Sequence, residues 1–185
     1  MKKSELERDV SFLIESIRKS DYEIPKNSDV MKVILSKLRV VVLIQALMIF
    51  LDFIMYGNEW GGFIGKVMFS LMGVLFFFFV FIMALYQPVS MMLSISDEVK
   101  NRSLIIKLLI EKIKKYWRLL IVVNLMIGGA LLFCDDGFII GLGLSWFATF
   151  LFSGLLFQMS LSRYMTPAVV SSLSKVKELL TASPK

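Results

Sequence analysis

The sequence predicts an all-α, polytopic membrane protein with four transmembrane helices in two hairpins, plus amphipathic helices on the cytoplasmic side. Hydrophobic residues make up 57% of the 185 positions, and charged residues only 19%. The apolar residues gather in stretches that approach or reach the ~20 residues a helix needs to cross a bilayer. Backbone polar groups in lipid need internal partners, so such stretches become helices. The predicted spans are Val40–Tyr56, Val67–Tyr86, Leu119–Cys134 and Phe138–Leu161.

The basic residues predict the orientation of these spans. Three segments contain every Lys and Arg except Lys66, and all three lie on one side of a four-span chain. Basic flanks mark the cytoplasmic side, so we expect a multi-pass protein of the bacterial inner membrane with both termini cytoplasmic. These segments are 1–39, 87–118 and 162–185. The net charge of +6 then reflects orientation in the lipid bilayer, and no nucleic-acid partner is expected.

The same pattern divides the chain into five parts. A cytoplasmic amphipathic region precedes the first transmembrane hairpin, and a basic cytoplasmic loop with an amphipathic helix separates it from the second hairpin. A short cytoplasmic helix follows, beginning at Thr166-Pro167 because proline favours the first helical position. The predicted parts are 1–38, 39–86, 87–116, 117–162 and 163–185.

The N-terminal segment has apolar residues at helical spacing, with charged residues between them. We expect a cytoplasmic helix of about four turns, followed by a linker at Ser20–Asp29. The apolar face could lie on the membrane, pack on other cytoplasmic segments or bind a partner protein. As a candidate partner-binding helix, its apolar residues are Leu6, Val10, Leu13, Ile14 and Ile17. Within the basic loop, Leu104–Trp117 predicts a second amphipathic helix that runs into the third span.

Four polar residues within the spans are expected to have partners. Asp52 and Lys66 flank the first outer turn, so an antiparallel hairpin brings them to a similar depth. Pairing lowers the cost of several kcal/mol for a charge in lipid. This intramembrane polar pair could be a structural ion pair or two side chains that extend to the headgroups, or Asp52 could line a conducting path or bind a partner. Gln45 and Asn124 are predicted to form interhelical hydrogen bonds that hold the bundle together.

The fourth span contains a ladder of small residues spaced four apart. Small side chains let helix backbones approach closely, so the ladder predicts a helix-packing face. It could pack on the third span, on another copy of the chain in a homo-oligomer, or on another protein. The ladder consists of Gly137, Gly141, Ser145, Thr149 and Ser153.

The sequence offers little that would support catalysis. The chain has no histidine and one cysteine, Cys134. We found no nucleophile with its base, no phosphate loop and no metal-ligand spacing, so we expect neither an enzyme nor a cofactor. Aromatic residues mark the ends of the spans, but Trp146 is an exception because it lies inside the fourth span.

The overall layout of the chain has a resemblance to a known family, which covers the whole chain in outline. The charged helix SELERDVSFLIESIRKSDYEIP, the entry MKVILSKLRVVVLIQ into the first span, and the polytopic, basic, cysteine-poor composition resemble the TraS-like entry-exclusion proteins of F-like conjugative plasmids. The resemblance implies an inner-membrane protein of the recipient cell that blocks redundant DNA transfer by recognising the donor mating-apparatus protein TraG. The alternatives are an immunity protein against a pore-forming colicin and a small accessory subunit of a channel or transporter.

Overall fold

The computed structural model describes residues 3–19, 25–56, 60–133 and 138–162, together with 164, 170, 171, 174, 175 and 178. Every regular element within these residues is an α-helix. The helices are α1 Lys3–Lys19, α2 Asn27–Tyr56, α3 Trp60–Ser94, α4 Asp97–Arg102, α5 Leu104–Leu131 and α6 Phe138–Ser162. The predicted all-α fold class is therefore confirmed for the described chain.

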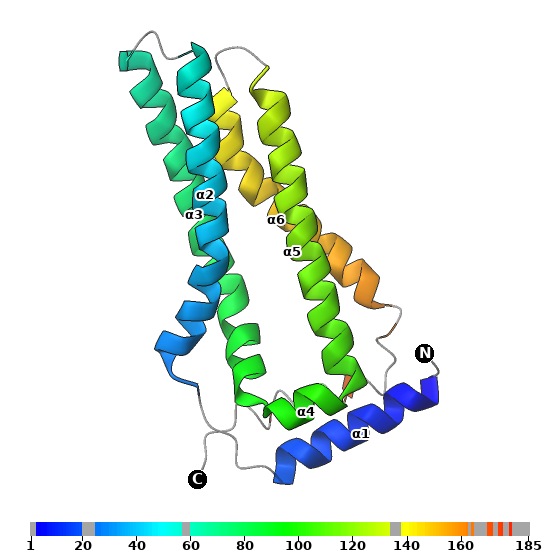
Figure 1. The fold of residues 1–185 in the computed structure, drawn as a ribbon. Helices are drawn as coiled ribbons and strands as arrows, with labels where there is room; N and C mark the ends of the chain where they lie inside the picture. The colour runs from blue at the N-terminus through cyan, green and yellow to red at the C-terminus, as the bar shows by residue number, and fades with distance from the viewer. Residues whose placement is uncertain are drawn as a thin grey trace.

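The long helices form a bundle whose two sides separate toward one end (Figure 1). Helices α2 and α3 run side by side and antiparallel, because Phe53 contacts Phe63 near one end and the Tyr86 hydroxyl donates to Asn27 near the other. Helix α6 crosses the bundle and packs on both α3 and α5. Helices α4 and α1 cover the end opposite the α2–α3 turn (Figure 1).

Three helices are long and apolar enough to cross a membrane, so the chain is a membrane-embedded protein. These candidate spans within the described residues are Asn27–Tyr56, Phe63–Ser94 and Gly141–Ser162. Helix α5 is not among them, because Lys114, Lys115 and Arg118 lie in its middle. Its described helix continues for only about three and a half turns beyond Arg118. The predicted third span therefore remains a prediction, and its last residue, Cys134, lies outside the described residues.

Helix boundaries extend beyond the predicted spans. Helix α2 begins at Asn27, inside the predicted linker, and α3 continues to Ser94, inside the predicted basic loop. The predicted helix start at Leu104 is confirmed: Ser103 is its N-cap, and the Ser103 hydroxyl accepts a hydrogen bond from the Ile106 amide. The predicted helix start at Thr166-Pro167 lies outside the described residues.

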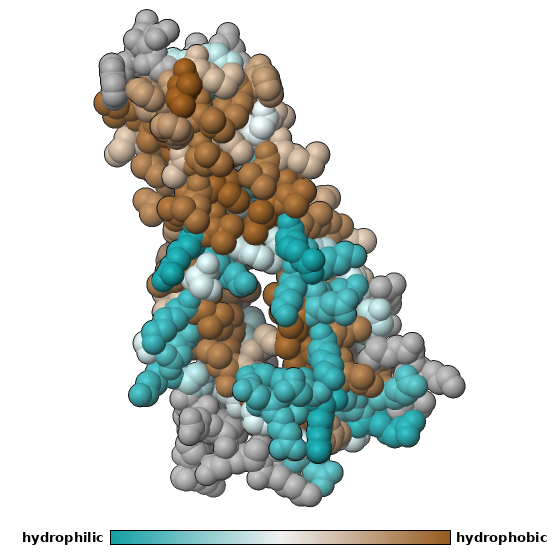
Figure 2. Space-filling model, viewed as in Figure 1, coloured by the Kyte–Doolittle hydropathy of each residue, from teal (hydrophilic) through white to brown (hydrophobic). Residues whose placement is uncertain are grey.

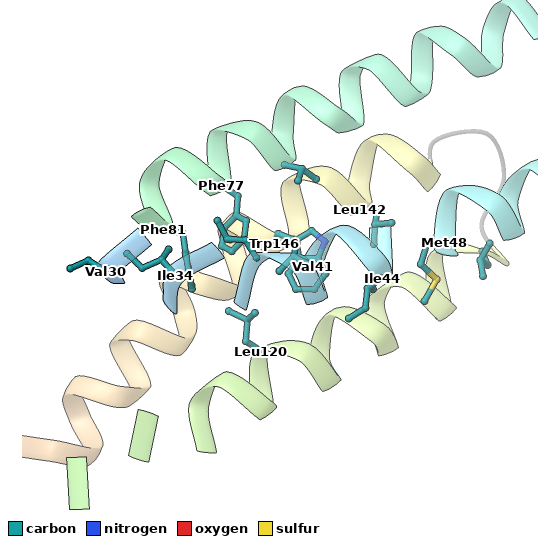
Figure 3. Close-up of a cluster of buried hydrophobic side chains, with 13 residues drawn as sticks. Val30, Ile34, Val41, Ile44, Met48, Phe77, Phe81, Leu120, Leu142 and Trp146 are labelled. Atoms are coloured by element: carbon teal, nitrogen blue, oxygen red, sulfur yellow. The ribbon is translucent and has the colours of Figure 1, made fainter. Parts of the chain in front are cut away.

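The core lies where α2, α3 and α6 meet (Figure 3). Trp146 of α6 is fully buried, and the centre of its ring lies 6.1 Å from the centre of the Phe77 ring. The Phe77 ring in turn lies 5.3 Å from the Phe81 ring. Ile34 and Val41 of α2 pack into the same cluster. On the face drawn in Figure 2, the upper part of the bundle is mostly hydrophobic, whereas the lower part carries most of the hydrophilic surface, with hydrophobic surface between. This division is the one expected for a helix bundle partly embedded in lipid.

Candidate functional site

Helices α3 and α6 approach each other closely where they cross. A Cβ atom built on Gly143 would collide with the Ser70 carbonyl oxygen and lie 2.9 Å from the Ser70 Cα. A Cβ atom on Gly73 would lie 2.9 Å from the Gly143 carbonyl carbon. Both glycines are needed because only residues without side chains let the two backbones touch. This crossing brings polar groups of four helices to one level of the bundle.

The first set of hydrogen bonds at this level joins α2, α3 and α6. The Gln45 side-chain amide donates to the Ser70 hydroxyl at 2.7 Å, and the Trp146 indole N–H donates to the Gln45 carbonyl oxygen at 3.1 Å. All three side chains are buried. Gln45 was predicted to form interhelical hydrogen bonds, and these two are its partners.

The second set joins α5 to α6. The Asn124 amide group donates to the Thr149 hydroxyl at 2.7 Å and to the Leu120 carbonyl oxygen at 2.9 Å. The Ser145 hydroxyl donates to the Asn124 carbonyl oxygen at 2.8 Å. Because Ser145 and Trp146 are consecutive residues of α6, the two sets of hydrogen bonds lie next to each other in the bundle. We call them together the polar network.

The chemistry of the polar network is structural. Its members are amides, hydroxyls and an indole, none of which gains or loses a proton near neutral pH. Among the described residues, no buried side-chain nitrogen or oxygen lacks a hydrogen-bond partner. A fully satisfied network in a low-dielectric core fixes helix register, since any slip would leave polar groups unpaired. The polar network therefore specifies one arrangement of the four long helices.

Asp52 and Lys66 lie near the α2–α3 turn. Because Phe53 contacts Phe63 and Gln45 contacts Ser70, Asp52 and Lys66 lie within about one helical turn of the same level. The Asp52 side chain is buried and Lys66 is half-buried. Each has an interaction partner, so neither is a lone charge.

The predicted ladder of small residues divides between two roles. Gly141 faces α5, since a Cβ there would lie 3.4 Å from the Leu131 side chain. Ser145 and Thr149 form hydrogen bonds with Asn124, which also belongs to α5. Ser153 is half-buried, and Gly137 lies outside the described residues. The tightest contact of α6 instead uses Gly143, which the ladder did not include.

The apolar face of α1 is buried inside the protein. Leu6, Val10 and Leu13 are all buried, and Leu13 packs with Val99 of α4 and Ile106 of α5. Ile14 contributes to the same clusters, and the side chain of Ile17 lies outside the described part of α1. Of the three possibilities left open, the structure has this face packed on other segments of the chain, α4 and α5, so the face is not available to a partner while α1 is docked.

Asp9 fastens α1 to the N-terminus of α5. Its carboxylate accepts hydrogen bonds from the Ser103 hydroxyl at 2.8 Å and from the backbone amides of Leu104 and Ile105 at 3.0 and 2.8 Å. The first turn of a helix has unpaired amides and a partial positive charge, which a carboxylate satisfies. The hydrogen bonds of Asp9 therefore add to the apolar contacts that hold α1 against α4 and α5.

Sequence reasoning missed several of these residues. Trp146 was noticed as an exception to the aromatic pattern, and its position mid-span was the signal that it has a polar partner. Asp9 lies three residues after Leu6 and four before Leu13, at the edge of the apolar face of α1, which was the signal for its burial. Ser70, Gly73 and Gly143 carried no signal that separated them from other small residues in the spans.

No candidate metal centre or related protein adds to this picture. Within the described ranges, no group of three His, Cys, Asp or Glu side chains could hold a metal ion. Comparisons of the chain with protein-family models, with curated proteins and with solved structures found no match.

Proposed function

We propose that the chain spans the bacterial inner membrane with four helices in two hairpins, α2–α3 and α5–α6, and with both termini in the cytoplasm. Support comes from the alignment of α5 with α2. Lys37 lies over Trp117 at one level, and the Tyr56 hydroxyl donates to the Leu132 carbonyl oxygen at another. Between these levels α2 rises about 28 Å, close to the ~30 Å hydrocarbon thickness. Between the same contacts, from Trp117 to Leu132, α5 rises about 22 Å beside α2.

The proposed topology has a direct test. Alkaline phosphatase fused after Glu59 or after Asp136 should be active, because both positions lie in outer turns. The same reporter fused after Lys185 should be inactive, and a cytoplasmic reporter there should be active. An active alkaline phosphatase at Lys185 would refute the proposed orientation.

We propose that this membrane protein acts by recognising another protein, as an entry-exclusion protein that blocks redundant conjugative transfer by binding TraG of the donor mating apparatus. The observation that carries the proposal is the cytoplasmic layer: the α1 segment that has the family resemblance folds into a helix docked on α4 and α5. Its polar side, with Ser11 exposed, faces away from the bundle. Specific interfaces bury roughly 1,200 Å² or more, and short outer turns cannot supply that area.

The docked layer refines which surface would bind the partner. Because Leu6, Val10 and Leu13 are buried against α4 and α5, the recognition surface in this proposal is the outer side of the assembled layer. Undocking α1 should then abolish exclusion. Leu13→Asp places a charge in the apolar contact with Val99 and Ile106, whereas Gly154→Ala adds to α6, outside this layer, a methyl group that meets nothing within 4 Å.

Conjugation into recipient cells tests the proposal. Cells expressing the full chain should receive an F-like plasmid less often than cells with an empty vector. Leu13→Asp should restore transfer while the protein still inserts in the membrane, and Gly154→Ala should exclude as well as the original chain. If cells that express Leu13→Asp exclude the plasmid as strongly as cells that express the original chain, the docked layer has no role in exclusion. Unreduced transfer combined with survival under pore-forming colicins would instead identify an immunity protein.

A further inference from the structure

A cation without a charged partner lies between α5 and α6. The Lys112 ammonium donates to the Ser160 hydroxyl at 2.7 Å, and Lys112 is half-buried. Within the described residues this neutral hydroxyl is its one hydrogen-bond partner, and no carboxylate pairs with it. A lysine ammonium has three N–H donors, and partial burial makes a charge costly unless it is paired. Lys112 therefore has donors to spare for an anion.

A second cation lies beside Lys112 on the outer side of α5. Lys115 lies three residues after Lys112 and so shares a face with it. Lys115 is exposed, and in the described chain it forms no ion pair, even with Glu111 four residues before it. Trp117, the residue of α5 that contacts Lys37 of α2, lies two residues after Lys115 and so about 200° around the helix. The two lysines therefore lie on the side of α5 that faces away from α2.

Exposed apolar side chains continue this face along the bundle. Leu119 lies four residues after Lys115, and Phe152 lies eight residues before Ser160, so each shares a helix face with a polar residue. They are 38% and 65% exposed. Because α5 and α6 are antiparallel with Lys112 beside Ser160, Leu119 and Phe152 lie about 10 and 12 Å from that pair in the same direction. We call these five residues the outer α5–α6 face.

The order of these residues along the bundle suits a phospholipid. In the proposed topology α5 runs from the cytoplasm outward, so Leu119 and Phe152 lie on the hydrocarbon side of the lysines. The headgroup layer of one leaflet is roughly 5–8 Å thick, and α5 rises about 6 Å from Lys115 to Leu119. A phosphate at the two lysines therefore places its acyl chains alongside Leu119 and Phe152. A free phosphate would leave these apolar side chains uncovered.

We propose that the outer α5–α6 face binds an anionic phospholipid, with Lys112 and Lys115 holding the headgroup phosphate and Leu119 and Phe152 contacting the acyl chains. The leaflet in which the lipid lies rests on the proposed topology, whereas the site is independent of entry exclusion. Each basic group near an anionic lipid contributes about fivefold in affinity. The two lysines together therefore account for roughly thirtyfold.

Helix geometry provides a matched control on the same helix. Lys114 lies two residues after Lys112 and Lys107 lies five residues before it, so both point roughly 200–220° away from it around α5. Both are exposed. The site variant Lys112→Gln/Lys115→Gln and the control variant Lys107→Gln/Lys114→Gln therefore remove the same charge from the same helix. They differ in whether that charge belongs to the outer α5–α6 face.

Native mass spectrometry of the purified full chain tests the proposal. The chain in detergent is titrated with dioleoyl phosphatidylglycerol or with dioleoyl phosphatidylcholine, and the concentration that half-saturates the first bound lipid is measured. Phosphatidylglycerol should bind at a concentration at least about tenfold lower. The site variant should reduce this difference to within about twofold, the control variant should leave it unchanged, and Lys112→Arg/Lys115→Arg should retain it.

A single substitution keeps the test valid if the site variant folds poorly. Elution and thermal unfolding check the fold of each variant. Lys115 is exposed and its ammonium has no hydrogen bond in the described chain, so Lys115→Gln should leave the fold intact and weaken phosphatidylglycerol binding about fivefold. Because the titration is made in detergent, its outcome does not depend on the topology that the reporter fusions test.

A photoreactive lipid tests the position of the acyl chains. Phosphatidylglycerol with a diazirine in one acyl chain should label peptides that contain Leu119 and Phe152 more strongly than the matching phosphatidylcholine does. Labelling confined to other helices would place the lipid elsewhere and overturn the proposal.

Three outcomes of the titration would also overturn the proposal. Equal binding of the two lipids would show that the headgroup charge is not recognised. Equal losses in the site and control variants would show a general attraction to the basic segment. Displacement by soluble glycerol phosphate at the concentration at which the lipid binds would identify a free-anion site instead.

Discussion

Gly143→Ala tests the helix crossing on which the polar network depends. The added methyl group would collide with the Ser70 carbonyl oxygen, and its distance to the Ser70 Cα would have to grow from 2.9 Å to at least 3.4 Å for ordinary contact. The obstructing atoms belong to the backbone of α3, which cannot rotate away as a side chain can. Helices α3 and α6 must therefore separate at their closest point.

The cost has two sources. Overpacking of a tight core typically costs about 1–3 kcal/mol. Gln45 bridges Ser70 of α3 and Trp146 of α6 by hydrogen bonds of 2.7 and 3.1 Å, so separation of α3 from α6 also stretches this bridge toward or beyond the usual limit of about 3.2 Å. An interhelical hydrogen bond in a membrane contributes about 0.6–2 kcal/mol. We expect the free energy of unfolding to fall by about 2–3 kcal/mol.

Unfolding in mixed micelles, followed by circular dichroism as the fraction of dodecyl sulfate rises, measures this change. Gly129→Ala and Gly154→Ala are matched controls, because a Cβ at either glycine meets nothing within 4 Å. Both should be neutral or stabilise the helix by up to about 1 kcal/mol, since alanine favours helix more than glycine does. If Gly143→Ala unfolds at the same point as these controls, the close crossing does not exist as described.

Two further predictions concern the buried hydrogen bonds. Trp146→Phe should lower the free energy of unfolding by about 1 kcal/mol, because the Gln45 carbonyl oxygen then loses its donor. In a protein that already carries Gln45→Leu, the same substitution should cost less. Equal costs with and without Gln45→Leu would show that the two side chains do not interact. Asp9→Ala should speed amide hydrogen exchange at Leu104 and Ile105 and weaken docking of α1 by about 1–2 kcal/mol, because it removes three hydrogen bonds. Ser11→Ala, which alters only a hydrogen bond within α1, should leave that exchange unchanged. If exchange at Leu104 and Ile105 stays slow in Asp9→Ala, the Asp9 hydrogen bonds do not hold α1 on α5.

Much of the fold was predictable because membrane insertion is a local property of a segment. The apolar stretches beginning at Val40 and Val67 correspond to α2 and α3, and the helix predicted to begin at Leu104 begins there. The helical spacing of Leu6, Val10 and Leu13 predicted the apolar face of α1, and the structure showed that this face is buried. Each of these features depends on the hydrophobicity of residues within a few turns of one another.

The polar sites were only half predictable. Desolvation requires that Gln45 and Asn124 have partners, so the sequence showed that both would be hydrogen-bonded. It did not show which groups would pair with them. Likewise, Phe76 and Phe77 are chemically the same, yet Phe76 is exposed and Phe77 fully buried, because a run of phenylalanines covers every side of a helix.

By itself, the sequence determined that this chain enters a membrane, where its apolar helices lie and which ends carry the basic residues. Only the tertiary structure decided that Trp146 meets Gln45, 101 residues away, and that Asp9 meets Ser103, 94 residues away. The physical reason is that these pairings depend on the angle and register at which helices cross. That geometry is set by the contact of Gly73 and Gly143, which no local pattern records.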